Sequence, residues 1–264
     1  MRTLLGLTIR CVFRPVKMAL PVIRRFRAMN LRRLPHLPFR RTAPLLFLVL
    51  ALPAWAAELL YLNTPAGAER LVAARYRQHY FQVQPYLESQ QNLAFCGPAS
   101  IAAVLNSLDL PRPASGPLYP YPFFTQDNVF TPATQRIKSY IQVNARGMTL
   151  AEFAAFLNAL GTRAAVHYAD ELDLAGLRAL VKATLENPKG RLVVNYSRKP
   201  LGQAGDGHLS PVGAYDEATD SVLLLDVAKF KYPPVWITLQ DLYTAIRTMD
   251  PDSGKSRGLV AVEG

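Results

Sequence analysis

Cysteine is almost missing from this 264-residue chain, which contains only Cys11 and Cys96. Residues 57–264 contain Cys96 alone, so this part of the chain cannot form an internal disulfide, and a zinc site built on several cysteines is excluded. Acidic residues are missing from residues 1–56, which carry eleven of the 30 lysines and arginines. The rest of the chain has 19 basic and 19 acidic residues, so the net charge of +11 belongs to the N-terminal segment.

The balanced charge of residues 57–264 argues against nucleic-acid binding, because phosphate backbones are bound by clustered lysines and arginines. The apolar stretch APLLFLVLALPAWAA, which begins at Ala43, is too short to span a bilayer comfortably. It follows a basic region and contains the small residues of an A-x-A cleavage site. We therefore predict that residues 1–56 are a signal peptide cleaved after Ala56, and that residues 57–264 form one exported, periplasmic domain.

The alternative is an uncleaved leader that anchors the protein in the inner membrane, with its domain facing the periplasm. In that case the leader is the only expected contact with the membrane. Whether the protein forms a homodimer is left open by the sequence.

Hydrophobic periodicity predicts a helical half followed by a β half. Helices are expected at 65–82, from Cys96 over about three turns, and at 131–140, 149–161, 173–186 and 239–248. Strands are expected at 191–196, 208–215, 221–227, 235–238 and 258–262. Residues 109–130, rich in proline and aromatic residues, predict a long ordered loop. This order predicts an α+β fold, with a cleft between a helical lobe and an antiparallel β lobe.

Cys96 opens an apolar segment with helical spacing, CGPASIAAVLN, which would place its thiol at a helix N-terminus. The free N–H groups of that end stabilise a thiolate, the nucleophilic form of cysteine. Exported proteins usually pair their cysteines in disulfides, so a lone one here indicates a catalytic nucleophile rather than an inert core residue. An oxyanion hole would take the backbone N–H of Cys96 and a side-chain amide from Gln90 or Gln91.

A cysteine nucleophile needs a general base, and residues 57–264 contain three histidines, His79, His167 and His208. His208 is favoured because it follows a glycine at the start of a predicted strand, where a base can face a cleft. Asp226 is the one acidic residue in the apolar strand VLLLDVA, and a buried carboxylate there needs a partner. The alternative for Asp226 is a strand-end aspartate that bonds to loop N–H groups.

The strands that carry His208 and Asp226 have the pattern of a hairpin. If its turn centres on Ala218, Ser210 pairs with Asp226, and His208 becomes a diagonal neighbour on the same face, with Cα atoms about 7–8 Å apart. A shift of the register by one residue would move Asp226 to the opposite face. The spacing therefore supports a His208–Asp226 pair but depends on the register.

Four segments together resemble the phytochelatin synthases, most closely the short bacterial synthase-like proteins. They are NTPAGAERL, CGPASIAAVLNSL, GHLSPVGAYDEATDSVLLLDVAKFKYPPVW and DPDSGKSRG, and they extend the resemblance over residues 63–262. The resemblance implies a papain-like fold with Cys96 as nucleophile, His208 as base and Asp226 as the residue that orients the base. It also selects Gln90 as the oxyanion donor.

The same resemblance implies that the substrate is glutathione. It assigns Asn195, Asp250 and Arg257 to the γ-glutamyl end of the substrate, with Gly207 also in the substrate site. The chemistry fits, because an arginine can bind a carboxylate through two hydrogen bonds and an aspartate can accept from an ammonium group. The alternative for Asp250 and Arg257 is a surface turn, since DPDSGKSRG is polar and turn-rich.

The implied activity is γ-glutamylcysteinyl transfer. Cys96 forms a thioester with release of glycine, and the acyl group passes to water or to a second glutathione, giving phytochelatin. Plant and fungal synthases carry a cysteine-rich C-terminal region that this sequence lacks, so we expect glutathione hydrolysis to be favoured. No cofactor and no bound metal ion are expected; Cd²⁺ or Zn²⁺ would enter as a glutathione thiolate complex.

Two other functions are compatible with parts of the sequence. A papain-like peptidase that cleaves leader peptides after a double glycine would share the cysteine, glutamine, histidine and aspartate, but has no need of NTPAGAERL or GKSRG. An exported, non-catalytic protein could bind soft metals through Cys96 and a histidine. A closed metal site needs three or four ligands at short spacing, and the sequence contains no such cluster.

Overall fold

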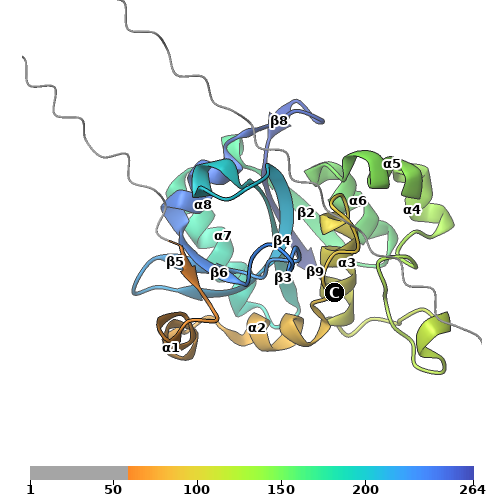
Figure 1. Cartoon of the computed structure of the whole chain (residues 1–264), viewed down its shortest axis with the longest axis horizontal. Coiled ribbons are helices and arrows are strands. Elements are labelled where there is room, and N and C mark those ends of the chain that lie inside the picture. The colour runs from red at the N-terminus through yellow and green to blue at the C-terminus, as the bar shows by residue number, and fades with distance from the viewer. Residues whose placement is uncertain (1–58) are drawn as a thin grey trace, which may run out of the picture. The chain divides into compact units, whose positions relative to one another are not determined.

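The computed structural model describes residues 59–264, so the predicted signal peptide and its cleavage site lie outside the described residues. The centre is a seven-stranded sheet in the order β1–β6–β5–β4–β3–β9–β2 (Figure 1), with every neighbouring pair antiparallel. The strands are β1 Leu60–Tyr61, β2 Arg163–Tyr168, β3 Gly190–Ser197, β4 Gly207–Asp216, β5 Ser221–Leu224, β6 Val235–Thr238 and β9 Gly258–Glu263. A separate hairpin pairs β7 Met249–Asp250 with β8 Lys255–Ser256.

Helices cover both faces of the sheet. They are α1 Pro65–Ala73, α2 Gln78–Val83, α3 Cys96–Asn106, α4 Pro132–Ile137, α5 Tyr140–Arg146, α6 Leu150–Ala159, α7 Leu174–Glu186 and α8 Leu239–Ile246. On one face, Leu177 of α7 and Leu242 of α8 share a core with Val194 of β3. On the other face, Phe153 of α6 packs in a core with Val193, because adjacent strand residues point to opposite faces.

The mixture of helices with an antiparallel sheet confirms the α+β class. The expected order of a helical half before a β half is wrong in detail, because β2 precedes α7 and both α7 and α8 pack on the sheet. Burying both faces of the sheet requires helices on both sides, which local periodicity does not reveal. None of the helices in the described part of the chain has the length and apolar character needed to cross a membrane.

The single helix predicted over 65–82 is wrong, because the chain leaves the helical conformation after Ala73. Ala74 adopts an extended ψ of 130°, and Tyr76 forms a bridge with Tyr215 of β4, whose N–H donates to the Tyr76 carbonyl at 2.8 Å. This bridge places the Tyr76 side chain in the core beneath α7. Tertiary burial of one large aromatic residue thus outweighs the local preference for a continuous helix.

Capping residues explain where other predictions succeeded and failed. Thr149 and Glu152 form the expected capping box at the start of α6, so the helix prediction for 149–161 is confirmed. Helix α5 was not predicted, although Ser139 and Gln142 form a second capping box at its start.

Two strands also differ from the prediction. Strand β2 was not predicted, and β5 ends at Leu224, before the expected end at 227.

Candidate active site

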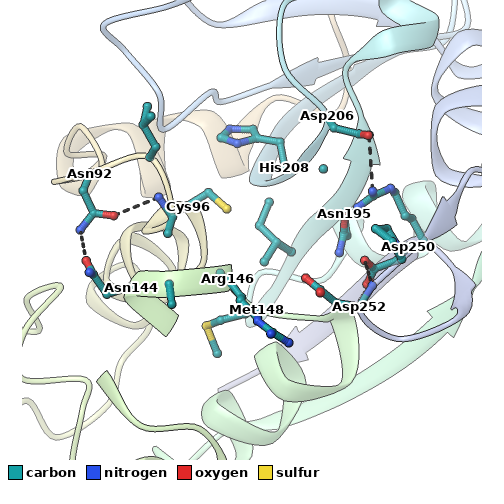
Figure 2. Close-up of a pocket in the computed structure, with 18 residues that line it drawn as sticks. Asn92, Cys96, Asn144, Arg146, Met148, Asn195, Asp206, His208, Asp250 and Asp252 are labelled. Atoms are coloured by element: carbon teal, nitrogen blue, oxygen red, sulfur yellow. Dashed lines mark hydrogen bonds and ion pairs between the residues drawn. The ribbon is translucent and has the colours of Figure 1, made fainter. Parts of the chain in front are cut away.

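Cys96 is the first residue of α3, and its side chain borders a cavity of about 640 Å³ (Figure 2). Every other residue of α3 is buried, so the helix is fixed in the core and its first residue alone reaches the cavity. A Cβ atom on Gly97 would lie 2.6 Å from Sδ of Met148. Glycine at this position therefore lets Met148 pack against the helix end directly below the thiol.

His208 lies at the start of β4, beside Cys96 and almost completely buried. Its Nε2 atom lies 2.9 Å from Oδ1 of Asp226, which leaves Nδ1 free to interact with the thiol. Asp226 is fully buried and also accepts a hydrogen bond from the backbone N–H of Ala228 at 2.8 Å. The structure thus brings Cys96, His208 and Asp226 together in one connected group.

The register that joins His208 to Asp226 differs from the predicted one near the turn and agrees with it near the site. Next to the turn, Asp216 pairs with Ser221, one residue out of the predicted register. A β-bulge at Gly213 then shifts the ladder, and Val212 pairs with Leu224 as predicted. The correct geometry at Asp226 therefore results from two deviations that cancel, a longer turn and a bulge.

The other two histidines do not border the cavity. His79 lies on α2, where its Nε2 atom is 3.0 Å from the carbonyl of Asn187. Burial lowers the pKa of His79 to about 4, so it is neutral at physiological pH. His167 lies in the edge strand β2, opposite Leu259. Neither residue contacts Cys96, and His208 is the histidine that faces the thiol.

The electrostatics of the site favour an ion pair between Cys96 and His208. Burial by itself would raise the pKa of the Cys96 thiol, but the hydrogen bond and the charge of His208 outweigh it, and the pKa lies below its usual value. Burial would lower the pKa of His208, but hydrogen bonds with Asp226 and Cys96 outweigh that effect and raise it. Both shifts favour the thiolate–imidazolium pair, the state that cysteine nucleophiles use.

These shifts predict the pH dependence of thiol reactivity. The Cys96 thiolate persists as the pH falls until its lowered pKa is reached, and only below that value is reactivity lost. At pH 6 we expect Cys96 to react with iodoacetamide about tenfold faster than free cysteine. His208→Ala should bring the rate close to that of free cysteine. Mass spectrometry of the labelled peptide separates Cys96 from Cys11; a midpoint of reactivity at or above the usual cysteine pKa would contradict this prediction.

The two candidate glutamines point in different directions. Gln90 is buried, its backbone N–H donates to the carbonyl of Val227 at 2.8 Å, and its side chain borders a second cavity of about 190 Å³ that His208 also lines. Its Nε2 donates to the carbonyl of Asn92 at 2.6 Å, and its buried Oε1 has no hydrogen-bond partner among residues 59–264. Gln91 is exposed. Gln90 is therefore the glutamine placed next to the histidine, and its role as an oxyanion donor stays a prediction.

All four residues predicted to bind substrate border the same cavity as Cys96, and Figure 2 shows Asn195 and Asp250 on the side opposite the thiol. Arg257 is buried and donates from Nη1 to Oδ1 of Asn195 at 3.0 Å. Asp250 is also buried, but its carboxylate accepts from the N–H of Asp252 at 3.2 Å and from Oγ of Ser253 at 3.0 Å, within the same turn. Its role in binding substrate stays a prediction. Gly207 has a steric role, because a Cβ atom there would lie 2.3 Å from Nη1 of Arg257.

Four charged residues at the site were not predicted from the sequence. Arg146 and Asp252 line the cavity without a hydrogen bond or ion pair to the predicted catalytic residues, and the other two are Asp206 and Arg198. Asp206 lines the cavity; its Oδ1 accepts from Oγ of Ser197 at 2.7 Å and lies 3.5 Å from Nη2 of Arg257. Arg198 follows β3 and forms a buried ion pair with Asp226 at 2.7 Å. Charged residues next to strands are common, so the position of Arg198 in the sequence gives no hint of its role. Asp206 directly precedes Gly207 and His208, and only this adjacency could have indicated that it belongs to the site.

No cluster of three or more histidine, cysteine, aspartate or glutamate side chains suited to a metal ion is present in residues 59–264. The charged groups that line the cavity are two arginines, Arg146 and Arg257, and three aspartates, together with the cysteine–histidine pair. The three aspartates are Asp206, Asp250 and Asp252. Such an arrangement can bind a small zwitterion and deliver a nucleophile to it.

Comparisons with known proteins agree on one family. A family model described as phytochelatin synthase matches residues 50–259. Glutathione gamma-glutamylcysteinyltransferase 1 of Triticum aestivum is 34% identical over 185 residues, which cover 69% of this chain and 35% of the relative. The glutathione gamma-glutamylcysteinyltransferase of Schizosaccharomyces pombe is 32% identical over 188 residues, covering 70% of this chain and 44% of the relative. The chain thus spans less than half the length of these curated relatives.

Proposed function

The chain belongs to the phytochelatin synthase family, and from this membership we propose that it is a thiol acyltransferase that cleaves glutathione and transfers the γ-glutamylcysteinyl group. The observation that carries the proposal is the position of the Cys96–His208–Asp226 group on the same cavity as Asn195 and the other three predicted substrate residues. We further propose a papain-like arrangement, in which α3 carries the nucleophile and this cavity is the cleft.

The proposed first step is attack of the Cys96 thiolate on the carbonyl carbon of the Cys–Gly peptide bond of glutathione. As the tetrahedral intermediate collapses, the C–N bond breaks and His208 transfers its proton to the departing glycine amine. A γ-glutamylcysteinyl thioester remains on Cys96. The backbone N–H of Cys96 and the amide of Gln90 would bind the oxyanion, and one such donor is worth about 3 kcal/mol in other acyl transfer enzymes.

The second step transfers the acyl group. Water, deprotonated by His208, releases γ-glutamylcysteine, whereas the amine of a second glutathione gives a short phytochelatin. The balance between these acceptors decides whether the protein is mainly a hydrolase or a synthase. Cd²⁺ or Zn²⁺ would act in this scheme as a thiolate complex of the glutathione substrate.

Recognition of the γ-glutamyl end is supported by charge complementarity. This end of glutathione carries an α-carboxylate and an α-ammonium group. Arg257 offers a buried cation and Asp250 a buried carboxylate on the same cavity wall, and Asn195 positions the guanidinium through its 3.0 Å hydrogen bond. The cation and the anion together fit a zwitterion better than they fit a neutral peptide end.

Mass spectrometry of the products tests this function. The protein is incubated with glutathione, with and without cadmium, and separately with a peptide that contains a double glycine. Release of glycine with γ-glutamylcysteine indicates a hydrolase, and longer γ-glutamylcysteine oligomers indicate a synthase. Cleavage of the double-glycine peptide with glutathione left intact would replace this proposal with the leader peptidase.

We also propose that the reaction takes place outside the cytoplasm. This proposal is supported by the leader sequence.

A Gly207→Ala variant tests the substrate residues. The added methyl group would displace Nη1 of Arg257, which a Cβ atom approaches to 2.3 Å, and would weaken binding of the γ-glutamyl carboxylate. We expect KM for glutathione to rise at least about tenfold, with a smaller change in kcat. Gly116→Ala is the matched control, because a Cβ atom there meets nothing within 4 Å. An unchanged KM in Gly207→Ala would remove Arg257 from the substrate site.

A further inference from the structure

Arg198 is an almost completely buried cation next to the proposed catalytic group, on the wall of the 190 Å³ cavity that Gln90 and His208 also line. Its side chain is 3% exposed, and that of Asp226 is 0% exposed. Nη2 donates to Oδ1 of Asp226 at 2.9 Å and lies 2.7 Å from Oδ2, while Nη1 donates to Oε1 of Gln203 at 2.7 Å. The rings of Tyr196 and Tyr232 flank the guanidinium, with centroids 5.7 Å and 5.2 Å away. Within residues 59–264, Asp226 is the carboxylate that pairs with this arginine.

The charges of the site explain why an arginine is needed there. In the reactive state Cys96 is a thiolate, His208 an imidazolium and Asp226 a carboxylate, which leaves one uncompensated negative charge in a largely buried cluster. Burying a net charge is costly, and Arg198 brings the total to zero. The other charged groups on the cavity that Arg198 and His208 share are Asp206 and Lys231, whose charges are opposite. Of the two tyrosines beside the guanidinium, Tyr196 is kept neutral by burial, which raises its pKa.

Arg198 also helps to fix the direction of the carboxylate. Oδ1 of Asp226 accepts from Nη2 of Arg198, lies in hydrogen-bond contact with Nε2 of His208 and accepts from the N–H of Ala228. Burial opposes ionisation of Asp226, but the hydrogen bond and charge of His208 and the charge of Arg198 outweigh it and lower its pKa. A carboxylate held from three sides fixes the tautomer and direction of the imidazole ring.

We propose that Arg198 is a positioning residue of the active site, which keeps the Asp226 carboxylate ionised and aimed at His208. The proposal rests on the proposed function only in taking Cys96 as the nucleophile. In this proposal Arg198 acts through Asp226.

The pH profile of Cys96 alkylation tests this role without any substrate. Removing a fixed positive charge raises the pKa of each ionisable neighbour, because anions lose stabilisation and the imidazolium loses a repelling charge. In Arg198→Met we therefore expect both the pH at which the thiolate forms and the pH at which the imidazolium is lost to move up by ~1 unit. Arg198→Lys retains the charge, and its profile should stay close to that of the wild type.

Arg191→Met is the matched control, because Arg191 is equally buried, at 2% exposed, but bonds to Ser107, Pro188 and Gly190 instead of the catalytic group. It should lower the melting temperature and leave the alkylation profile unshifted. If Arg198→Met behaves in the same way, Arg198 is a structural residue and the proposal is wrong. The proposed function fails separately if the wild-type protein shows the alkylation profile expected for a lowered Cys96 pKa and yet releases no glycine from glutathione.

Discussion

Replacing Cys96 with serine is expected to slow glycine release from glutathione by about 10⁴-fold or more, because loss of a nucleophile removes most of the rate enhancement of such enzymes. The serine hydroxyl has nearly the same size as the thiol, but it does not ionise at neutral pH. The ion pair that lowers the pKa of Cys96 and raises that of His208 cannot form with it. Glycine, quantified by mass spectrometry under single-turnover conditions, measures the effect.

The same experiment detects the intermediate in the wild-type protein. Acid-quenched samples should carry a γ-glutamylcysteinyl adduct on the peptide that contains Cys96, and hydroxylamine should remove it because thioesters react with that nucleophile. Thermal unfolding of Cys96→Ser should match that of the wild type, since Gly97 to Asn106 keep α3 in the core. A variant that retains more than about a hundredth of the wild-type rate would rule out covalent catalysis by Cys96.

Asp226→Asn is expected to reduce kcat for glutathione cleavage by about 10³-fold. Papain-like proteases use an asparagine to orient their histidine, so loss of charge alone does not explain so large an effect. In this protein, Oδ2 of Asp226 faces Nη2 of Arg198 at 2.7 Å, and an amide nitrogen in that place would put two donors together. The neutral side chain would also leave Arg198 uncompensated beside the His208 imidazolium and lower the pKa of His208.

A double variant separates these causes. Asp226→Asn combined with Arg198→Met removes both charges, so the thiolate and the imidazolium again form a neutral pair. We expect the double variant to be at least about tenfold faster than Asp226→Asn alone, a positive coupling in a double-mutant cycle. Arg191→Met in place of Arg198→Met supplies the control and should give no recovery. Additive losses in both combinations would show that Arg198 and Asp226 do not act as a pair.

The residues of the site illustrate what a sequence can predict. Helices α3, α6 and α7 follow from apolar spacing and from caps such as Thr149 and Asp173, because all of this information lies within one short segment. The lone cysteine at a helix start, the histidine at a strand start and the acid in an apolar strand could be selected for the same reason. Their chemistry is readable from residue type and immediate neighbours.

The register between β4 and β5 illustrates the opposite case. The predicted pairing is correct beyond Gly213 only because a bulge compensates for a longer turn. At the bulge, Gly213 leaves room for the side chain of Leu225, which a Cβ atom on Gly213 would approach to 2.9 Å. That fit joins residues twelve positions apart, Gly213 in β4 and Leu225 just after β5, and no pattern within either segment contains it.

By itself, the sequence determined the reactive groups: one thiol at a helix end, one histidine next to a glycine, one acid in an apolar strand and the polar segment around Asp250. The tertiary structure alone decided which charges compensate one another. Arg198 reaches Asp226 across 28 positions of the chain, and Arg257 reaches Asn195 across 62. Long side chains act far from their own backbone, and a buried charge is tolerated only where its partner is also buried, so these pairs form once the sheet has assembled.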